Sequence, residues 1–63
     1  MDIKHLTYMA NQIARNFAVR GESVAAEATA QHIRDYWEPR MTAALRADPG
    51  GLDDIAKEAF RQL

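Results

Sequence analysis

The hydrophobic residues in the first third of the chain repeat at the spacing of one helix face. The intervals are 3, 4, 3 and 4 positions, and the residues are Ile3, Leu6, Ala10, Ile13 and Phe17. This period is typical of an amphipathic helix with one apolar stripe. Asp2 is a suitable N-cap before the stripe, and Gly21 is a suitable stop after it. The pattern predicts a first helix over residues 2–20, with Tyr8 on its far side.

The next segment predicts a second helix over residues 23–38, and its apolar side is wide. Its polar residues fall within about a third of the helical circumference, and alanines, Val24, Ile33 and the pair Tyr36–Trp37 fill much of the rest. A simple surface helix needs only about 100° of apolar face. The width indicates either a second contact outside the chain or a close approach of helices through small alanines.

Pro39 divides this helix from a shorter one. Proline disfavours helical conformation at the residue before it and is well accepted as the first residue of a new helix. Met41, Ala44 and Leu45 then share one face, which predicts a third helix over residues 39–47.

A loop signal, Asp48-Pro49-Gly50-Gly51, precedes a last helix that is predicted over residues 52–63. We therefore predict an all-α fold. It would be a small bundle of three to four helices that forms a single helical domain over residues 1–63, with the loop 48–51 before the last helix.

Composition narrows the possible functions of these 63 residues. The absence of cysteine excludes disulfides and thiolate metal sites, and it is compatible with a reducing cytoplasm. Eight basic and nine acidic residues nearly cancel, so the basic surface expected of a nucleic-acid binder is missing. No apolar run is long enough to cross a bilayer, and no signal-peptide pattern is present, so we expect no membrane segment.

Candidate chemistry is sparse. A metal site needs three or four converging ligands, and His5 and His32 lie on different predicted helices. Asp53 and Asp54 are adjacent, so on a helix they point about 100° apart. Their place in a first turn, where the helix dipole favours negative charge, explains them as helix-start residues. We therefore expect no catalytic, cofactor-binding or metal-binding residues in the chain.

Two segments carry a resemblance to a known family. They are His5 to Phe17, which contains Met9-Ala10-Asn11-Gln12-Ile13, and Gln31 to Met41, which contains His32-Ile33-Arg34-Asp35-Tyr36-Trp37-Glu38-Pro39-Arg40-Met41. The chain resembles the delta subunit of cytoplasmic, NAD-dependent, molybdenum-containing formate dehydrogenases, whose sequences contain the strings MANQI and HI..FW.PRM. It departs from the pattern in having Tyr36 in place of phenylalanine, a single aromatic at Phe17, and a short loop 48–51.

The resemblance implies an accessory role. In that family, other subunits carry bis-molybdopterin guanine dinucleotide, iron–sulfur clusters and FMN and react with NAD, whereas the delta subunit carries no redox centre. The implied function is support of assembly, stability or molybdenum-cofactor insertion by docking on the catalytic subunit. Formate oxidation to CO2 would take place on the other subunits.

The expected partner interface combines the aromatic–proline junction with polar positions of the first motif. Large aromatics and arginine are enriched at buried contacts between proteins. Trp37 would be the anchor, although it could equally be the core residue of so small a domain. Tyr8 could equally be a lone surface aromatic. The expected interface residues are Tyr8, Asn11, Gln12, Tyr36, Trp37, Pro39, Arg40 and Met41.

Two other readings stay open from the sequence. The wide apolar side of the second helix could form a homodimer when the chain is isolated. Short helices joined by tight turns also suggest a small helix-turn-helix regulator. That class needs a basic recognition helix, and the second helix offers only Arg34 against Glu27, Asp35 and Glu38.

Overall fold

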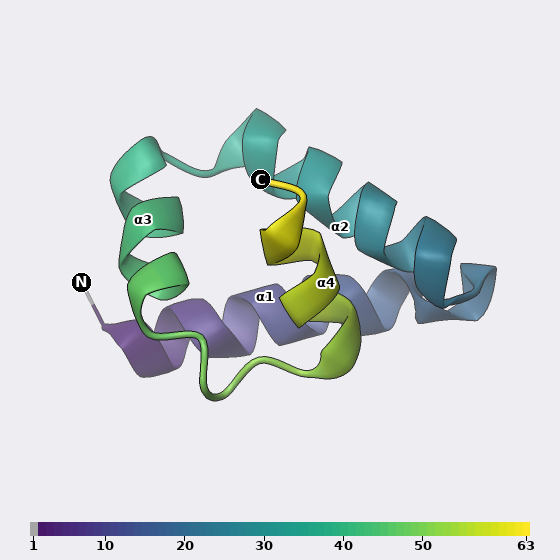
Figure 1. Cartoon of the computed structure of the whole chain (residues 1–63), viewed down its shortest axis with the longest axis horizontal. Coiled ribbons are helices and arrows are strands. Elements are labelled where there is room, and N and C mark those ends of the chain that lie inside the picture. Colours follow the sequence, from purple (N-terminus) through teal and green to yellow (C-terminus); the bar gives the residue numbers. More distant parts are fainter. Residues whose placement is uncertain (1) are drawn as a thin grey trace.

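The computed structural model describes residues 2–63, and within them it confirms the predicted all-α fold. Four α-helices and one short 3-10 turn follow one another along the chain, and no strand is present in this range (Figure 1). The elements are α1 (Ile3–Phe17), η1 (Ala18–Arg20), α2 (Glu22–Tyr36), α3 (Pro39–Ala47) and α4 (Asp54–Arg61).

Both ends of α1 have a local cause. Asp2 is the N-cap, as predicted, and its side chain accepts a hydrogen bond of 2.9 Å from the backbone N–H of Lys4. The α-helix ends at Phe17, three residues before the predicted end, because the chain tightens into η1. Gly21 follows with a φ of 95°, a conformation that favours glycine. The reversal at Gly21 starts α2 one residue before the predicted boundary.

Pro39 separates α2 from α3, as predicted, and occupies the first turn of α3. The predicted end of the second helix at residue 38 is wrong by two residues. Trp37 and Glu38 are both extended, with ψ angles of 141° and 146°. The residue before a proline avoids helical conformation, so α2 has to end before Glu38. The resulting two-residue connection turns α3 away from the axis of α2 (Figure 1).

Residues 48–51 form the predicted loop, but α4 starts two residues later than predicted. Asp53 is the N-cap of α4, and its Oδ1 accepts a hydrogen bond of 2.8 Å from the backbone N–H of Ala56. Leu52 therefore belongs to the connection, where its side chain is buried. At the other end of α4, the guanidinium of Arg34 donates a hydrogen bond to the carbonyl of Gln62.

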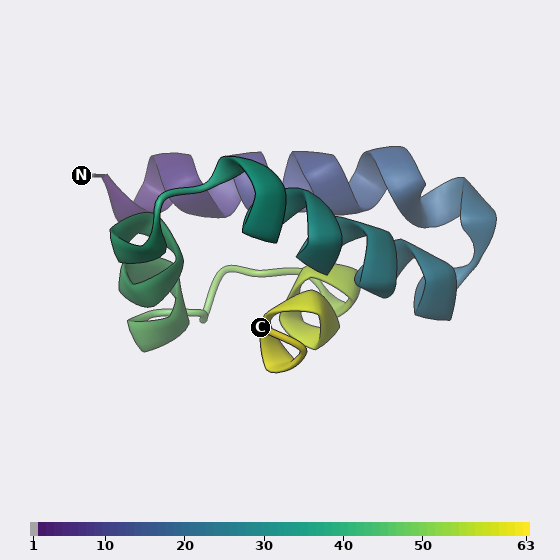
Figure 2. The same cartoon turned by 90° about the horizontal axis from the view of Figure 1, so that it is seen from above.

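The helices pack as a pair crossed by a third. α1 and α2 run antiparallel, α4 lies against both of them, and α3 closes one end of α1 (Figure 2). Small side chains line the contacts and permit close approach of the helix axes. The core consists of Leu6, Ala10, Ala14, Ile33, Trp37, Leu45, Leu52, Ala56 and Phe60.

Candidate partner interface

Trp37 is a core residue of this chain, which leaves little of its ring available as an anchor for a partner. Its side chain is 8% exposed and meets Phe60 edge to face, with ring centroids 6.2 Å apart and planes inclined by 68°. The extended backbone at Trp37 takes the ring out of the direction of α2 and under α4. The equally open alternative, that the single tryptophan fills the core, is the one the structure supports.

Asn11, another of the expected interface residues, uses its side-chain amide within the chain. Its Nδ2 donates to the carbonyl of Gly51 at 3.1 Å, and its Oδ1 accepts from the backbone N–H of Asp53 at 2.9 Å. Both groups of the amide are thus used inside the chain. Gln12 is half-buried, and its Oε1 accepts a hydrogen bond of 3.2 Å from Arg15 on the same helix.

The junction between α2 and α3 remains open to solvent. Pro39 is exposed, and Arg40 lies 3.6 Å from Glu38 across the junction with 78% of its side chain exposed. An ion pair this exposed contributes less than about 1 kcal/mol. Met41 is half-buried against the core, and it shares a shallow hollow with Leu6, Glu38 and Arg40. Arg40 is therefore able to exchange its partner at little cost.

Tyr36 belongs to a ridge along α2 that sequence reasoning found only as a wide apolar side. We call Val24, Ala28, His32 and Tyr36 the α2 ridge, because residues four apart follow one another along one side of a helix. Tyr36 is 74% exposed and contacts the His32 ring in a tilted arrangement, with centroids 4.7 Å apart and planes inclined by 40°. Val24 is 50% exposed at the other end. The spacing of four from Tyr36 was the signal that could have identified this ridge.

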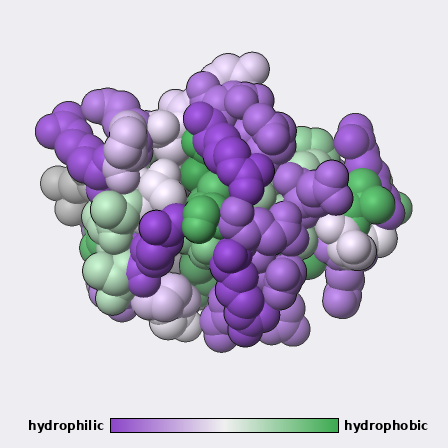
Figure 3. All heavy atoms as spheres, turned by 45° about the horizontal axis from the view of Figure 1, so that its top comes forward, coloured by the Kyte–Doolittle hydropathy of each residue, from purple (hydrophilic) through white to green (hydrophobic). Residues whose placement is uncertain are grey.

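Hydrophobic surface is also exposed away from the α2 ridge. Hydrophobic residues are visible among the hydrophilic ones in a central band, and in a separate patch at the end where α1 turns into α2 (Figure 3). Val19, in that turn, is 91% exposed. Tyr8 is 62% exposed, and helical geometry places it between Lys4 and Arg15, opposite the buried face of α1. The eight expected interface residues therefore do not form one surface.

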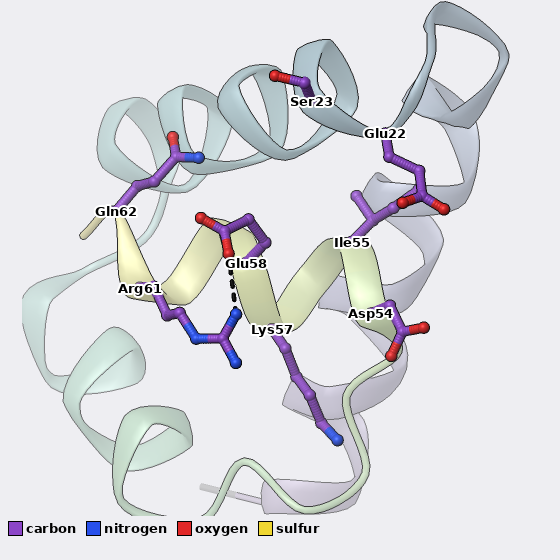
Figure 4. Close-up of a pocket in the computed structure, with 8 residues that line it drawn as sticks. All are labelled: Glu22, Ser23, Asp54, Ile55, Lys57, Glu58, Arg61 and Gln62. Atoms are coloured by element: carbon purple, nitrogen blue, oxygen red, sulfur yellow. Dashed lines mark hydrogen bonds and ion pairs between the residues drawn. The ribbon is translucent and has the colours of Figure 1, made fainter.

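A hollow of about 520 Å³ lies between the start of α2 and α4. Glu22 and Ser23 come from α2, Gln62 follows the end of α4, and the remaining lining residues come from α4 (Figure 4). Glu58 and Arg61 pair across one turn of α4 at 2.9 Å. Glu22 and Asp54 stand in the first turns of their helices, where negative charge is favoured. These charges are explained by helix starts and helix pairs rather than by a reaction.

Comparison with models of protein families relates the chain to a known family. The family model described as "NADH-dependant formate dehydrogenase delta subunit FdsD" matches residues 5–60 of the chain. The chain belongs to this family. The resemblance drawn from the two motifs is thereby confirmed, since both lie within the matched residues. No curated protein and no solved structure matches the chain.

In this member of the delta-subunit family, the two motifs have mixed structural roles. Asn11 of the first motif fixes the loop before α4, and Ile13 packs against the core. In the second motif, Ile33 and Trp37 are buried, whereas Tyr36 and Arg40 are exposed. A motif of this kind therefore combines positions that maintain the fold with positions that are free to meet a partner.

In this member of the delta-subunit family, residues 2–63 contain neither a cluster of metal ligands nor a helix that could span a membrane. Within residues 2–63, no three histidine or carboxylate side chains gather in a way that could hold a metal ion. Each helix in the same range is too short or too polar to cross a bilayer.

Proposed function

We propose that this chain is a non-catalytic accessory subunit that docks on the catalytic subunit of an NAD-dependent formate dehydrogenase through the α2 ridge. The observation that carries this proposal is the exposure of Tyr36. It is 74% exposed, yet its ring is already held against His32 at a centroid distance of 4.7 Å. Membership of the delta-subunit family supplies the class of partner.

The α2 ridge has the physical properties of a docking surface. A tyrosine offers a large contact area with few rotatable bonds, so little conformational entropy is lost when a partner covers it. The contact with His32 restricts the ring on one side and reduces that loss further. Ala28 lies in the middle of the ridge, and a small residue there lets the backbone of another element approach closely. Val24 extends the ridge by about one further turn beyond Ala28.

Arg40 would help to orient the chain on its partner. It follows the α2 ridge across the junction at Pro39, and its only ion pair among residues 2–63 is the exposed one with Glu38. A guanidinium can form a two-point bond with a carboxylate of the partner, and such charge-assisted bonds are stronger than neutral ones. The apolar ridge would supply contact area, and Arg40 would help to fix the orientation of docking.

The role we propose for this chain requires only that it binds the catalytic subunit, and it requires no reaction on the chain itself. A small protein that binds only the folded form of a larger one stabilises it by mass action. Docking would therefore support assembly or stability of the catalytic subunit, and it could hold that subunit in a form that accepts its molybdenum cofactor. The bis-molybdopterin guanine dinucleotide, iron–sulfur clusters, FMN and NAD would all belong to other subunits, and the complex would act in the cytoplasm.

Co-purification tests this proposal. The chain is expressed with an affinity-tagged catalytic subunit from the same genome, and the amount retained is measured for the wild type and for Tyr36→Ala. Tyr8→Ala is the matched control, because it removes the other exposed tyrosine, which lies on a different surface. We expect Tyr36→Ala to lower retention at least about tenfold, as hot-spot tyrosines do, and Tyr8→Ala to leave it unchanged. Loss with Tyr8→Ala alone would move the docking surface to α1, and no retention of the wild type would end the proposal.

A homodimer of the isolated chain is the second candidate. The four-residue spacing of the α2 ridge matches the rows that interlock when two helices pack. Sedimentation of the wild type should then reveal a dimer that Tyr36→Ala abolishes. A helix-turn-helix regulator is less favoured, because α3, the helix after the tight turn, offers only Arg40 and Arg46 as basic residues.

A further inference from the structure

We propose that a basic hollow between α3 and α4 binds an acidic, extended segment of a partner protein. The hollow has a volume of about 370 Å³. Its lining residues are Arg46, Pro49, Leu52, Lys57, Phe60 and Arg61. This inference goes beyond docking through the α2 ridge, because it concerns other elements and another kind of contact.

Three elements build the basic hollow. Arg46 comes from the last turn of α3, Pro49 and Leu52 from the connection, and the remaining lining residues from α4. Lys57, Phe60 and Arg61 are three and four positions apart, so they share one side of α4. The ends of Lys57 and Arg61 point from α4 away from α2, towards the side where α3 and the connection lie (Figure 4).

The floor of the basic hollow is apolar and fixed. Leu52 is 4% exposed and Phe60 is 7% exposed, and both belong to the hydrophobic core. The edge-to-face contact with Trp37 further restrains the Phe60 ring. A ligand side chain that enters the hollow therefore meets a preformed surface and does not have to order it, which lowers the entropic cost of binding.

The rim of the hollow carries one sign of charge. Three cationic side chains line it and no acidic one does, although the whole chain has a net charge of −1. Arg61 forms an ion pair with Glu58, in which Nη1 lies 2.9 Å from Oε1. Arg46 and Lys57 form no ion pair within residues 2–63. A concave surface lined by one sign of charge concentrates the field and attracts the opposite charge.

Charge and size together select the occupant. A volume of about 370 Å³ lies near the lower limit for ligand pockets, so it accommodates a few side chains and excludes a packed helix. An apolar side chain over Leu52 and Phe60, flanked by carboxylates that reach Arg46 and Lys57, satisfies both the floor and the rim. An extended acidic segment with one central apolar residue has this form.

A peptide titration tests the proposal on the full chain. The probe is a fluorescent decapeptide with a central leucine flanked by glutamates, and the matched peptide has glutamine at every glutamate. The acidic peptide should bind and should shift backbone amide signals around Arg46, Lys57 and Phe60 in nuclear magnetic resonance spectra. We expect the glutamine peptide to bind at least about tenfold more weakly, because the attraction is electrostatic.

A pair of double variants locates the site. Arg46→Gln with Lys57→Gln should weaken binding of the acidic peptide about fivefold to tenfold, as two exposed ion pairs would. Lys4→Gln with Arg15→Gln is the control, since it removes the same charge from α1 and should change affinity less than about twofold.

Three outcomes would overturn the proposal. They are an absence of binding, an equal loss of affinity in the α1 control, and amide shifts that inorganic phosphate alone reproduces. The last would make the hollow a simple anion site. None of these results bears on the α2 ridge, so a failure here is distinct from a failure of the co-purification experiment.

Discussion

The side chain of Asn11 accepts a hydrogen bond of 2.9 Å from the backbone N–H of Asp53, 42 residues further along the chain. The same amide donates to the carbonyl of Gly51 at 3.1 Å. Asp53 in turn caps α4 through the N–H of Ala56. One polar side chain of α1 is therefore tied both to the loop and to the N-cap residue of the last helix.

Asn11→Ala should destabilise the fold by about 1 to 2 kcal/mol, because it removes two hydrogen bonds and leaves their partners on the backbone unpaired. Urea unfolding followed by circular dichroism measures the change. Asn16→Ala is the control, since Asn16 is exposed on the same helix and its removal should matter little. Equal stability of the two variants would mean that the loop is held by other contacts.

Trp37 and Tyr36 are neighbours with opposite roles. Truncating a buried tryptophan costs about 3 to 5 kcal/mol, which is a large part of the stability of a domain this size. Trp37→Ala should therefore be largely unfolded, and Tyr36→Ala should melt close to the wild type. Thermal unfolding distinguishes the two variants. A stable Trp37→Ala protein would contradict the assignment of Trp37 to the core.

Thr29 carries a polar group into the core. Its side chain is fully buried in α2, and its hydroxyl has no hydrogen-bond partner among residues 2–63. Thr29→Val keeps the shape and removes the unpaired group, so it should stabilise the protein by about 1 kcal/mol. Thr29→Ala instead leaves a cavity and should destabilise it. A lower melting temperature for Thr29→Val would indicate that the hydroxyl does find a partner.

Gly21 adopts a backbone conformation that residues with a side chain rarely adopt. Its φ is 95°, and an added Cβ would strain that conformation although nothing else lies within 4 Å. With a ψ of 150°, this is a region that is essentially restricted to glycine, so Gly21→Ala should cost about 1 to 3 kcal/mol. Gly50 is equally open but lacks a positive φ, so Gly50→Ala should be neutral or slightly stabilising. Chemical denaturation of both variants measures their free energies of unfolding. An equal loss of stability in the two variants would contradict this account.

Much of the fold could be predicted from the sequence, because its determinants are local. The apolar spacing in α1, the Asp2 cap, the break at Pro39 and the loop before α4 all act within a few residues. The predicted helix ends were inaccurate where the backbone leaves the α-helical conformation at residues whose helix propensity does not indicate an end. Examples are the tightening into η1 and the extended conformation at Trp37.

The candidate interface was harder to predict, because burial depends on distant contacts. Nothing near Asn11 in sequence indicates that its amide will meet residues 51–53. Likewise, the partner that buries Trp37 is Phe60, on the last helix. Tyr36 could be separated from Trp37 only after the end of α2 was known. The family motif did not help here, because it contains both the core residue and the exposed one.

Photo-crosslinking tests the central claim, docking through the α2 ridge, most directly. Benzoylphenylalanine is placed at position 36, or at position 8 for comparison, and cells that make the formate dehydrogenase subunits are irradiated. A probe at position 36 should form a covalent product with the catalytic subunit, and one at position 8 should not. A product from position 8 alone, or no product with the catalytic subunit from position 36, would contradict the proposed docking surface.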